Sequence, residues 1–186
     1  MIVVSRPIEV VLEGLDRFRG LGGSSVASAN DRTTVESVLS ALNSFSEIVR
    51  YLNTRRSRGA ILTLEDEASV QDALYLMLRP WINDLTPESP TDRIANQFSI
   101  KDFCSCANGF VIEAKFVRDK SHGKSIVKEI NDDIETYRYH PRCDDLIFFI
   151  YDPDSNIPDS ASVQRHISES RTYGTKVLRC HGVIKP

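Results

Sequence analysis

Two carboxylates and one amine stand close together in the sequence, at Asp102, Glu113 and Lys115. Carboxylate oxygens are the ligands that hard cations such as Mg²⁺ prefer. A bound cation lowers the pKa of its water and stabilises charge on a phosphate, and a neighbouring lysine stabilises the same negative charge. These three residue types therefore suffice for metal-dependent hydrolysis of a phosphodiester, provided that the fold brings them together.

The same residues have a structural alternative, because acid–lysine pairs on an exposed strand are common and contribute little to stability. Spacing alone favours that alternative. However, Glu113 and Lys115 interrupt a run that is otherwise apolar, residues 110–117. A charge in such a run is costly unless it is used. We therefore favour the functional interpretation.

A hairpin would place the three residues on one surface. An Asn-Gly pair separates two candidate strands, 98–106 and 110–117, and is typical of a two-residue hairpin turn. That turn sets Asp102 opposite Lys115. Because strand side chains alternate, Glu113 then shares their face. The other face carries an apolar layer that favours this arrangement, made of Phe103, Phe110, Ile112, Ala114 and Phe116.

Residues 33–53 are predicted to form one long helix. Thr33 and Glu36 fit a capping box, in which each side chain satisfies a free backbone donor. Apolar residues follow at alternating spacings of three and four: Val35, Val38, Leu42, Phe45, Val49 and Leu52. This seam fits a helix that packs on its own domain, or alternatively a dimer or partner helix. About three heptads favour the first interpretation over a coiled coil.

The remaining pattern predicts alternating strands and helices. Further strands are expected at 60–64, 146–151 and 175–184, and further helices at 65–79, 125–138 and 160–169. Loops are expected at the proline-rich segment 80–90 and at the charged segment 118–124. This order predicts an α/β domain in which helices flank a mixed sheet on both faces.

Composition bounds the class of protein. With 186 residues, 41% of them hydrophobic and 26% charged, the chain is predicted to be soluble and globular, with no membrane span. We expect residues 1–30 to form an N-terminal segment with a flexible linker, and residues 31–186 to form one domain.

A net charge of −3 argues against nucleic-acid binding by bulk charge but leaves a local basic groove open. Four cysteines without paired CxxC spacing, and no signal-peptide pattern, predict a reduced chain in the cytoplasm.

The sequence also resembles the PD-(D/E)XK nuclease superfamily, whose catalytic motif is matched by Asp102 and by the stretch I-E-A-K at 112–115. Further blocks agree in order and spacing: EASVQD at 67–72, NDLTPE at 83–88, EINDDIETYRYHP at 129–141 and LIFFIYDPD at 146–154. Together they are similar to the nuclease domain associated with the MboI and DpnII restriction enzymes and with bacterial defence proteins. The likeness covers about residues 35–185 and implies a restriction-endonuclease-like fold with an N-terminal helical extension.

The resemblance implies roles by position. Asp102, Glu113 and Glu67 would be metal-binding catalytic acids, and Lys115 would be the catalytic lysine. The implied supporting residues are Gln71, Glu129, Asp133 and Tyr137, of which the last three form one helical stripe. Two positions depart from the family: Glu129 stands where glutamine is frequent, and Ile100 stands where an arginine commonly precedes the Asp-Phe pair. We therefore expect the substrate contacts of this chain to differ from those of the family at these two positions.

Basic residues near these motifs are candidates for phosphate contacts, with ordinary solvated charge as the alternative. They are Arg118, Lys120, Lys124 and Lys128 after the second strand, and Arg55, Arg56 and Arg58 after the first helix. His122 and His140 are candidate general bases, although surface or capping roles are favoured for both.

These features predict a Mg²⁺-dependent DNA endonuclease, with Mn²⁺ as an alternative ion, in prokaryotic defence against foreign DNA. Because duplex cleavage needs two cuts, we expect a homodimer, or a partner or sensor subunit. One alternative is a catalytically silent nuclease-like module for nucleic-acid binding or assembly. Another is a nuclease that acts on RNA or single strands.

Overall fold

The computed structural model describes residues 34–55, 59–90 and 100–186, all within the unit Thr33–Pro186. The expectations for residues 1–30, for Thr33, and for Arg56 and Arg58 lie outside the described residues. None of the helices in the described ranges is long and apolar enough to cross a bilayer.

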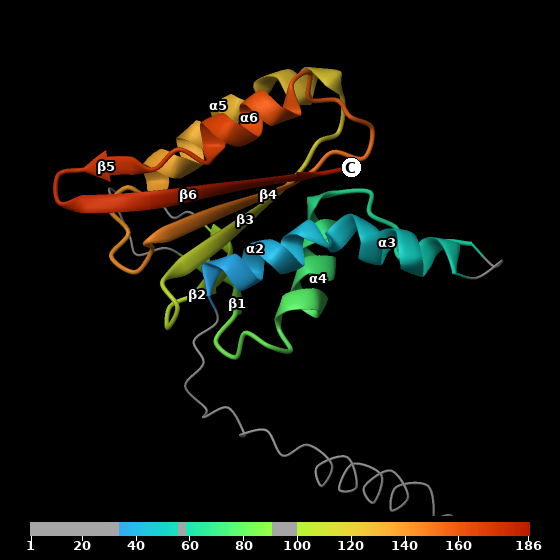
Figure 1. Ribbon diagram of the computed structural model, residues 1–186, viewed down its shortest axis with the longest axis horizontal. Coiled ribbons are helices and arrows are strands. Elements are labelled where there is room, and N and C mark those ends of the chain that lie inside the picture. The colour runs from blue at the N-terminus through green and yellow to red at the C-terminus, as the bar shows by residue number, and fades with distance from the viewer. Residues whose placement is uncertain (1–33, 56–58, 91–99) are drawn as a thin grey trace, which may run out of the picture. The chain divides into compact units, whose positions relative to one another are not determined.

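The described residues form a mixed sheet flanked by helices, which confirms the predicted fold class (Figure 1). Its strands are β1 (Thr86–Pro90), β2 (Ile100–Ser105), β3 (Phe110–Phe116), β4 (Asp145–Tyr151), β5 (Arg171–Tyr173) and β6 (Lys176–Lys185), in the spatial order β1-β2-β3-β4-β6-β5. The helices are α2 (Val35–Asn43), α3 (Phe45–Thr54), α4 (Glu67–Leu78), α5 (Lys120–Tyr137) and α6 (Ser160–Ile167). Pairing is parallel for β3–β4 and β4–β6 and antiparallel elsewhere.

Each face of the sheet has its own apolar core. On one face, Ile112, Ala114 and Phe149 pack with residues of α2 and α4. On the other, Val111 and Phe148 pack with α5 and α6. The alternation of β3 side chains between the two cores follows from the period of a strand. Even the polar Glu113 is buried, on the face that α5 covers, because β3 lies inside the sheet.

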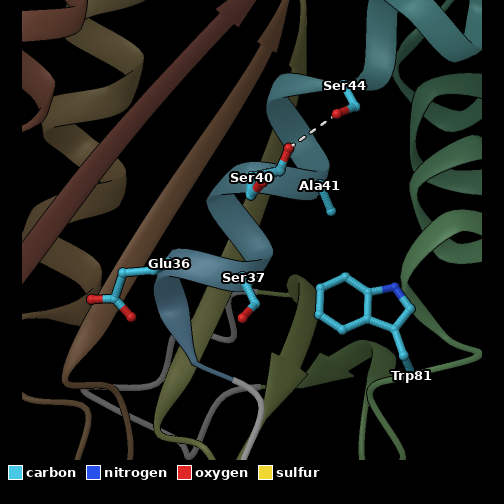
Figure 2. Close-up of a pocket in the computed structure, with 6 residues that line it drawn as sticks. All are labelled: Glu36, Ser37, Ser40, Ala41, Ser44 and Trp81. Atoms are coloured by element: carbon cyan, nitrogen blue, oxygen red, sulfur yellow. Dashed lines mark hydrogen bonds between the residues drawn. The ribbon is translucent and has the colours of Figure 1, made fainter.

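The helix predicted at 33–53 is wrong in its continuity. The helix breaks at Ser44, whose N–H donates to the Ala41 carbonyl at 2.9 Å. The Ser44 hydroxyl donates to the Ser40 carbonyl, as Figure 2 shows. A serine hydroxyl that bonds to the backbone competes with the helix. Thr34 caps the start of α2, where its side chain accepts from the Ser37 N–H. The apolar seam packs into its own domain, with Val38, Leu42 and Phe45 buried in the core.

Two elements near the proline-rich segment differ from expectation. Residues 60–64 form no strand, because the Asn53 side chain takes up the N–H groups of Ile61 and Leu62 and the Leu62 carbonyl. Conversely, the segment predicted as a loop contains β1. Its Pro87 and Pro90 are tolerated because β1 is the edge strand, where one side of the backbone needs no ladder partner.

The predicted hairpin register is wrong by two residues. Ser105 pairs with Phe110 and Phe103 with Ile112, so the loop has four residues, and Gly109 takes a left-handed conformation (φ 73°). The Asp84 carboxylate stabilises this loop by accepting from Ala107 N, Ser105 Oγ and Asn108 Nδ2. Because the shift is an even number of residues, every side chain keeps its predicted face.

The helix predicted at 125–138 begins earlier, at Lys120, so the charged segment 118–124 is mostly helical. Asp119 caps it by accepting from the N–H groups of Ser121 and His122. The last predicted strand, 175–184, is also part of a hairpin, in which β5 and β6 turn at Gly174 (φ 62°). A left-handed glycine permits that tight turn.

Gly123 lets α5 approach the loop that follows β4. A Cβ at this position would lie 2.4 Å from the Asn156 carbonyl oxygen. Alanine normally stabilises a helix interior by roughly 1 kcal/mol over glycine. Here we expect Gly123→Ala to destabilise the protein by about 1–3 kcal/mol instead, because helix or loop must move. Urea unfolding measures the change, with the exposed helical exchange Ser125→Ala as control. A more stable Gly123→Ala protein would contradict the close approach.

Candidate active site

Asp102 lies where β2 leaves β3. The pairing of the two strands reaches Phe103 and Ile112, and the Asp102 carboxylate accepts the next available β3 N–H, that of Ala114, at 2.6 Å. The Gln71 side chain of α4 lines the same cleft as Asp102 and favours the charged form of its carboxyl. A carboxylate thus replaces a strand–strand hydrogen bond, and this fixes its position beside β3.

Glu113 is held inside the sheet face that α5 covers. It is only 5% exposed, and the Tyr137 hydroxyl donates to its Oε1. Burial, with a further contribution from the charge of Asp102, raises the pKa of Glu113 to about 8. Burial likewise raises the pKa of Asp102 to about 6, against the Ala114 hydrogen bond and with the charge of Glu67. The charge of Asp102 thus destabilises the ionised form of Glu113, and the charge of Glu67 destabilises that of Asp102.

Lys115 follows on the same face of β3 and pairs with Asp133 of α5, with 2.9 Å between Nζ and Oδ2. Burial on its own would lower the pKa of Lys115, but the charge of the paired Asp133, with the charges of Glu113 and Glu67, outweighs it and raises this pKa. Lys115 is therefore a permanent cation among carboxylates.

The spacing of β3 and α5 explains both contacts. Residues two apart on a strand are separated by about 6.6 Å. Residues four apart on a helix rise by about 6 Å. Since α5 runs back along β3, Tyr137 meets Glu113 and Asp133 meets Lys115. The match of a two-residue and a four-residue spacing is a sequence feature, but it indicates these two pairs only once the direction of α5 along β3 is known.

Glu67 begins α4, directly after its N-cap Asp66, whose capping box with Ser69 starts the helix there. Its charge contributes to the pKa of both Asp102 and Lys115, which places it in their electrostatic neighbourhood.

Two clefts lie beside the start of α4 and Asp102. One is lined by Glu65, Asp66, Glu67, Phe116, Arg118, His122 and Glu129, and the other by Gln71, Asp72, Tyr75, Pro87, Asp102 and Phe103.

Glu129 faces the first cleft and contacts His122 instead of the β3 residues. His122 Nδ1 accepts from the Arg118 N–H at 3.3 Å, so its Nε2 carries the proton that is shared with Glu129 Oε2, also at 3.3 Å. His122 therefore has an orienting contact to a cleft carboxylate, which the sequence alone did not indicate. His140 is buried at the end of α5, where its Nδ1 accepts from the Arg142 N–H.

The basic candidates are spread over separate surfaces. Arg118 lines the first cleft. Lys120, Lys124 and Lys128 are exposed on α5, and the helical angle sets Lys124 roughly 140° around the axis from Glu129. Arg55 lies at the end of α3, where it contacts Tyr51. Of these described residues, Arg118 alone belongs to a cleft that also contains a predicted acid.

The donor set fits a hard divalent cation. Within the described ranges, no three His, Cys, Asp or Glu side chains are already arranged as a metal site. Nevertheless, Asp102 and Glu113 supply only oxygen donors, and burial raises the pKa of both carboxyls against the charge of Lys115. A cation between them would favour the ionised form of both acids, which is the electrostatic condition for binding such an ion.

Comparison with known proteins gives one match. The sequence-family model DpnII-MboI, described as a restriction endonuclease (REase), matches residues 35–180. No curated protein and no solved structure is significantly similar to the chain. The matched range contains α2 to α6 and the sheet as far as the middle of β6. It also contains the three acids Glu67, Asp102 and Glu113 and the lysine Lys115. The chain belongs to the DpnII-MboI restriction endonuclease family, whose members are DNA nucleases.

Proposed function

We propose that this protein is a Mg²⁺-dependent endonuclease that hydrolyses DNA phosphodiester bonds at Asp102, Glu113 and Lys115. The observation that carries the proposal is the convergence of two partly or fully buried carboxylates with raised pKa values, Asp102 on β2 and Glu113 on β3, and the charged Lys115 of β3. A scaffold gains nothing from such an arrangement, since buried like charges are costly.

Asp102 and Glu113 would hold the cation, with Glu67 as a third acid from α4. When bound, Mg²⁺ would stabilise the negative charge of the phosphate and lower the pKa of a water molecule. Lys115 would donate to a non-bridging phosphate oxygen as its negative charge grows. Gln71 and the Ala114 N–H would keep Asp102 in place, and Tyr137 would keep Glu113 in place. Glu129, oriented by His122, would border the cleft through which the DNA strand passes.

The family match supports a role in defence, and the need for two cuts per duplex supports a second subunit. We place the protein in prokaryotic defence against foreign DNA, in the cytoplasm, acting as a homodimer or with a partner or sensor subunit. Arg118, from the first cleft, is the described cation best situated to contact a phosphate near the acids. Lys120, Lys124, Lys128 and Arg55 would contact more distant phosphates.

Incubation of supercoiled plasmid with the protein tests the proposal. We expect nicking or linearisation with Mg²⁺ or Mn²⁺ and none with chelator. Asp102→Asn should abolish it, whereas Asp132→Asn, at an exposed position of α5, should not. Cleavage of RNA or single-stranded DNA in preference to duplex DNA would identify that nucleic acid, and not the duplex, as the substrate. Duplex binding without cleavage under any metal would favour the silent module.

A further inference from the structure

The ion pair between Lys115 and Asp133 is more shielded than an ordinary surface pair. The two side chains are 15% and 29% exposed, with Nζ and Oδ2 2.9 Å apart. By contrast, Arg138 and Glu135 on the same helix are 40% and 60% exposed, at 3.6 Å. Exposed pairs of the second kind contribute little. A pair in a partly desolvated site restricts its partners far more.

Asp133 is also held by its surroundings. The Tyr137–Glu113 contact lies one helical turn further along and fixes the register of α5 on β3. Ile130 and Ile134, both buried, anchor the adjacent side of the helix in the core. The Asp133 carboxylate therefore has a defined position, and it transmits that position to the flexible four-carbon chain of Lys115.

The other charged neighbours of Lys115 are Glu113, Glu67 and Asp102, all of which are proposed metal-binding acids. If Asp133 were neutral, those three carboxylates would be the remaining anions for the amine. Lys115 would then turn towards the oxygens that the cation requires. A separate carboxylate for the lysine thus keeps the amine and the cation from competing for the same ligands.

We infer that Asp133 is a positioning residue for Lys115: it holds the amine beside the metal-binding acids but off them, and releases it to the scissile phosphate. This inference rests on the proposed function of Lys115 in phosphodiester hydrolysis. It assigns α5 a part in the reaction although Asp133 itself touches neither the substrate nor the cation.

Three variants separate this role from general charge effects. Asp133→Asn removes the charge but keeps the shape, Asp133→Glu restores the charge, and Asp132→Asn makes the first change at the neighbouring exposed position. For Asp133→Asn we expect kcat to fall by about 10–100-fold, as for other residues that orient a catalytic group. We also expect a higher Mg²⁺ concentration at half-maximal rate, with KM for DNA little changed. Asp133→Glu should recover part of both losses, and Asp132→Asn should behave as wild type.

A double-mutant cycle tests whether Asp133 acts through Lys115. In the background of Lys115→Gln, adding Asp133→Asn should cost no further activity, because the group that it positions is gone. Independent losses that multiply would overturn the inference. So would an unchanged kcat and Mg²⁺ requirement in Asp133→Asn, or equal losses in Asp132→Asn.

A readout without catalysis distinguishes this inference from the proposed function. Limited labelling with an amine-reactive ester, followed by peptide mass spectrometry, measures how available the Lys115 amine is in each variant. We expect labelling of Lys115 to change several-fold in Asp133→Asn, because the amine moves from Asp133 to other carboxylates, and to stay unchanged in Asp132→Asn. If wild type cleaves no nucleic acid but labelling responds this way, the positioning contact stands and the nuclease proposal fails. Unchanged labelling overturns the positioning contact itself.

Discussion

Lys115→Gln is expected to lower the rate of plasmid cleavage by at least about 10²-fold, the loss typical when one donor to a developing negative charge is removed. Glutamine is one atom shorter than lysine but keeps an amide N–H donor on the side of Asp133, so a polar group still faces the partly buried carboxylate. The loss should appear in kcat, because the lysine acts on charge that grows in the transition state. Single-turnover cleavage at saturating protein measures it directly.

Lys124→Gln is the matched control, since Lys124 is exposed on the side of α5 that faces away from Glu129. Its removal should leave single-turnover cleavage unchanged and weaken duplex binding at most modestly, with a shallower salt dependence. Equal losses in both variants would indicate that Lys115 contributes only general positive charge. Undiminished cleavage by Lys115→Gln would remove the lysine from the mechanism.

The face that carries the site could be predicted from the sequence even though its register could not. The two-residue turn expected from the Asn-Gly pair is a local preference, and Asp84, distant in sequence, overrides it by binding three groups of a four-residue loop. The error was harmless because strand side chains repeat every two residues and the shift was two. Apolar alternation, which fixed the face, reflects burial and is therefore more robust than turn type.

Other differences have the same origin in contacts that join distant parts of the chain. The first helix was expected to be continuous because its apolar seam is continuous, and Ser44 interrupts the backbone without interrupting the seam. The Asp133–Lys115 and Tyr137–Glu113 pairs needed the direction of α5 relative to β3, which a crossover connection supplies only once both elements are known. Residue types and faces were thus predictable, whereas partners across elements were not.

Glu113→Gln is expected to raise stability in the absence of metal while it removes activity. Burial and the charge of Asp102 raise the pKa of Glu113 from 4.5 to about 8. A folded-state pKa above the unfolded value means that folding takes up a proton, so the stability of wild type falls as pH rises from about 4.5 to about 8. Glutamine cannot ionise and can still accept from Tyr137. The advantage of the variant should therefore be negligible near pH 4 and complete above pH 8.

The full difference should be on the order of a few kcal/mol, or a rise in Tm of about 2–4 °C for each kcal/mol in a chain of this size. Glu47→Gln, the same exchange at an exposed position of α3, should show little of this pH dependence. Saturating Mg²⁺ should reverse the order, because a cation that binds only the folded wild type stabilises it by mass action. Thermal unfolding across pH 4–9, with and without Mg²⁺, measures both effects. A Glu113→Gln protein that is less stable than wild type at pH 9 without metal would show that the buried carboxylate contributes more through its hydrogen bond with Tyr137 than it costs through its charge. In that event the strain ascribed to the acid pair, and with it the electrostatic reason for a cation at this point, would be absent.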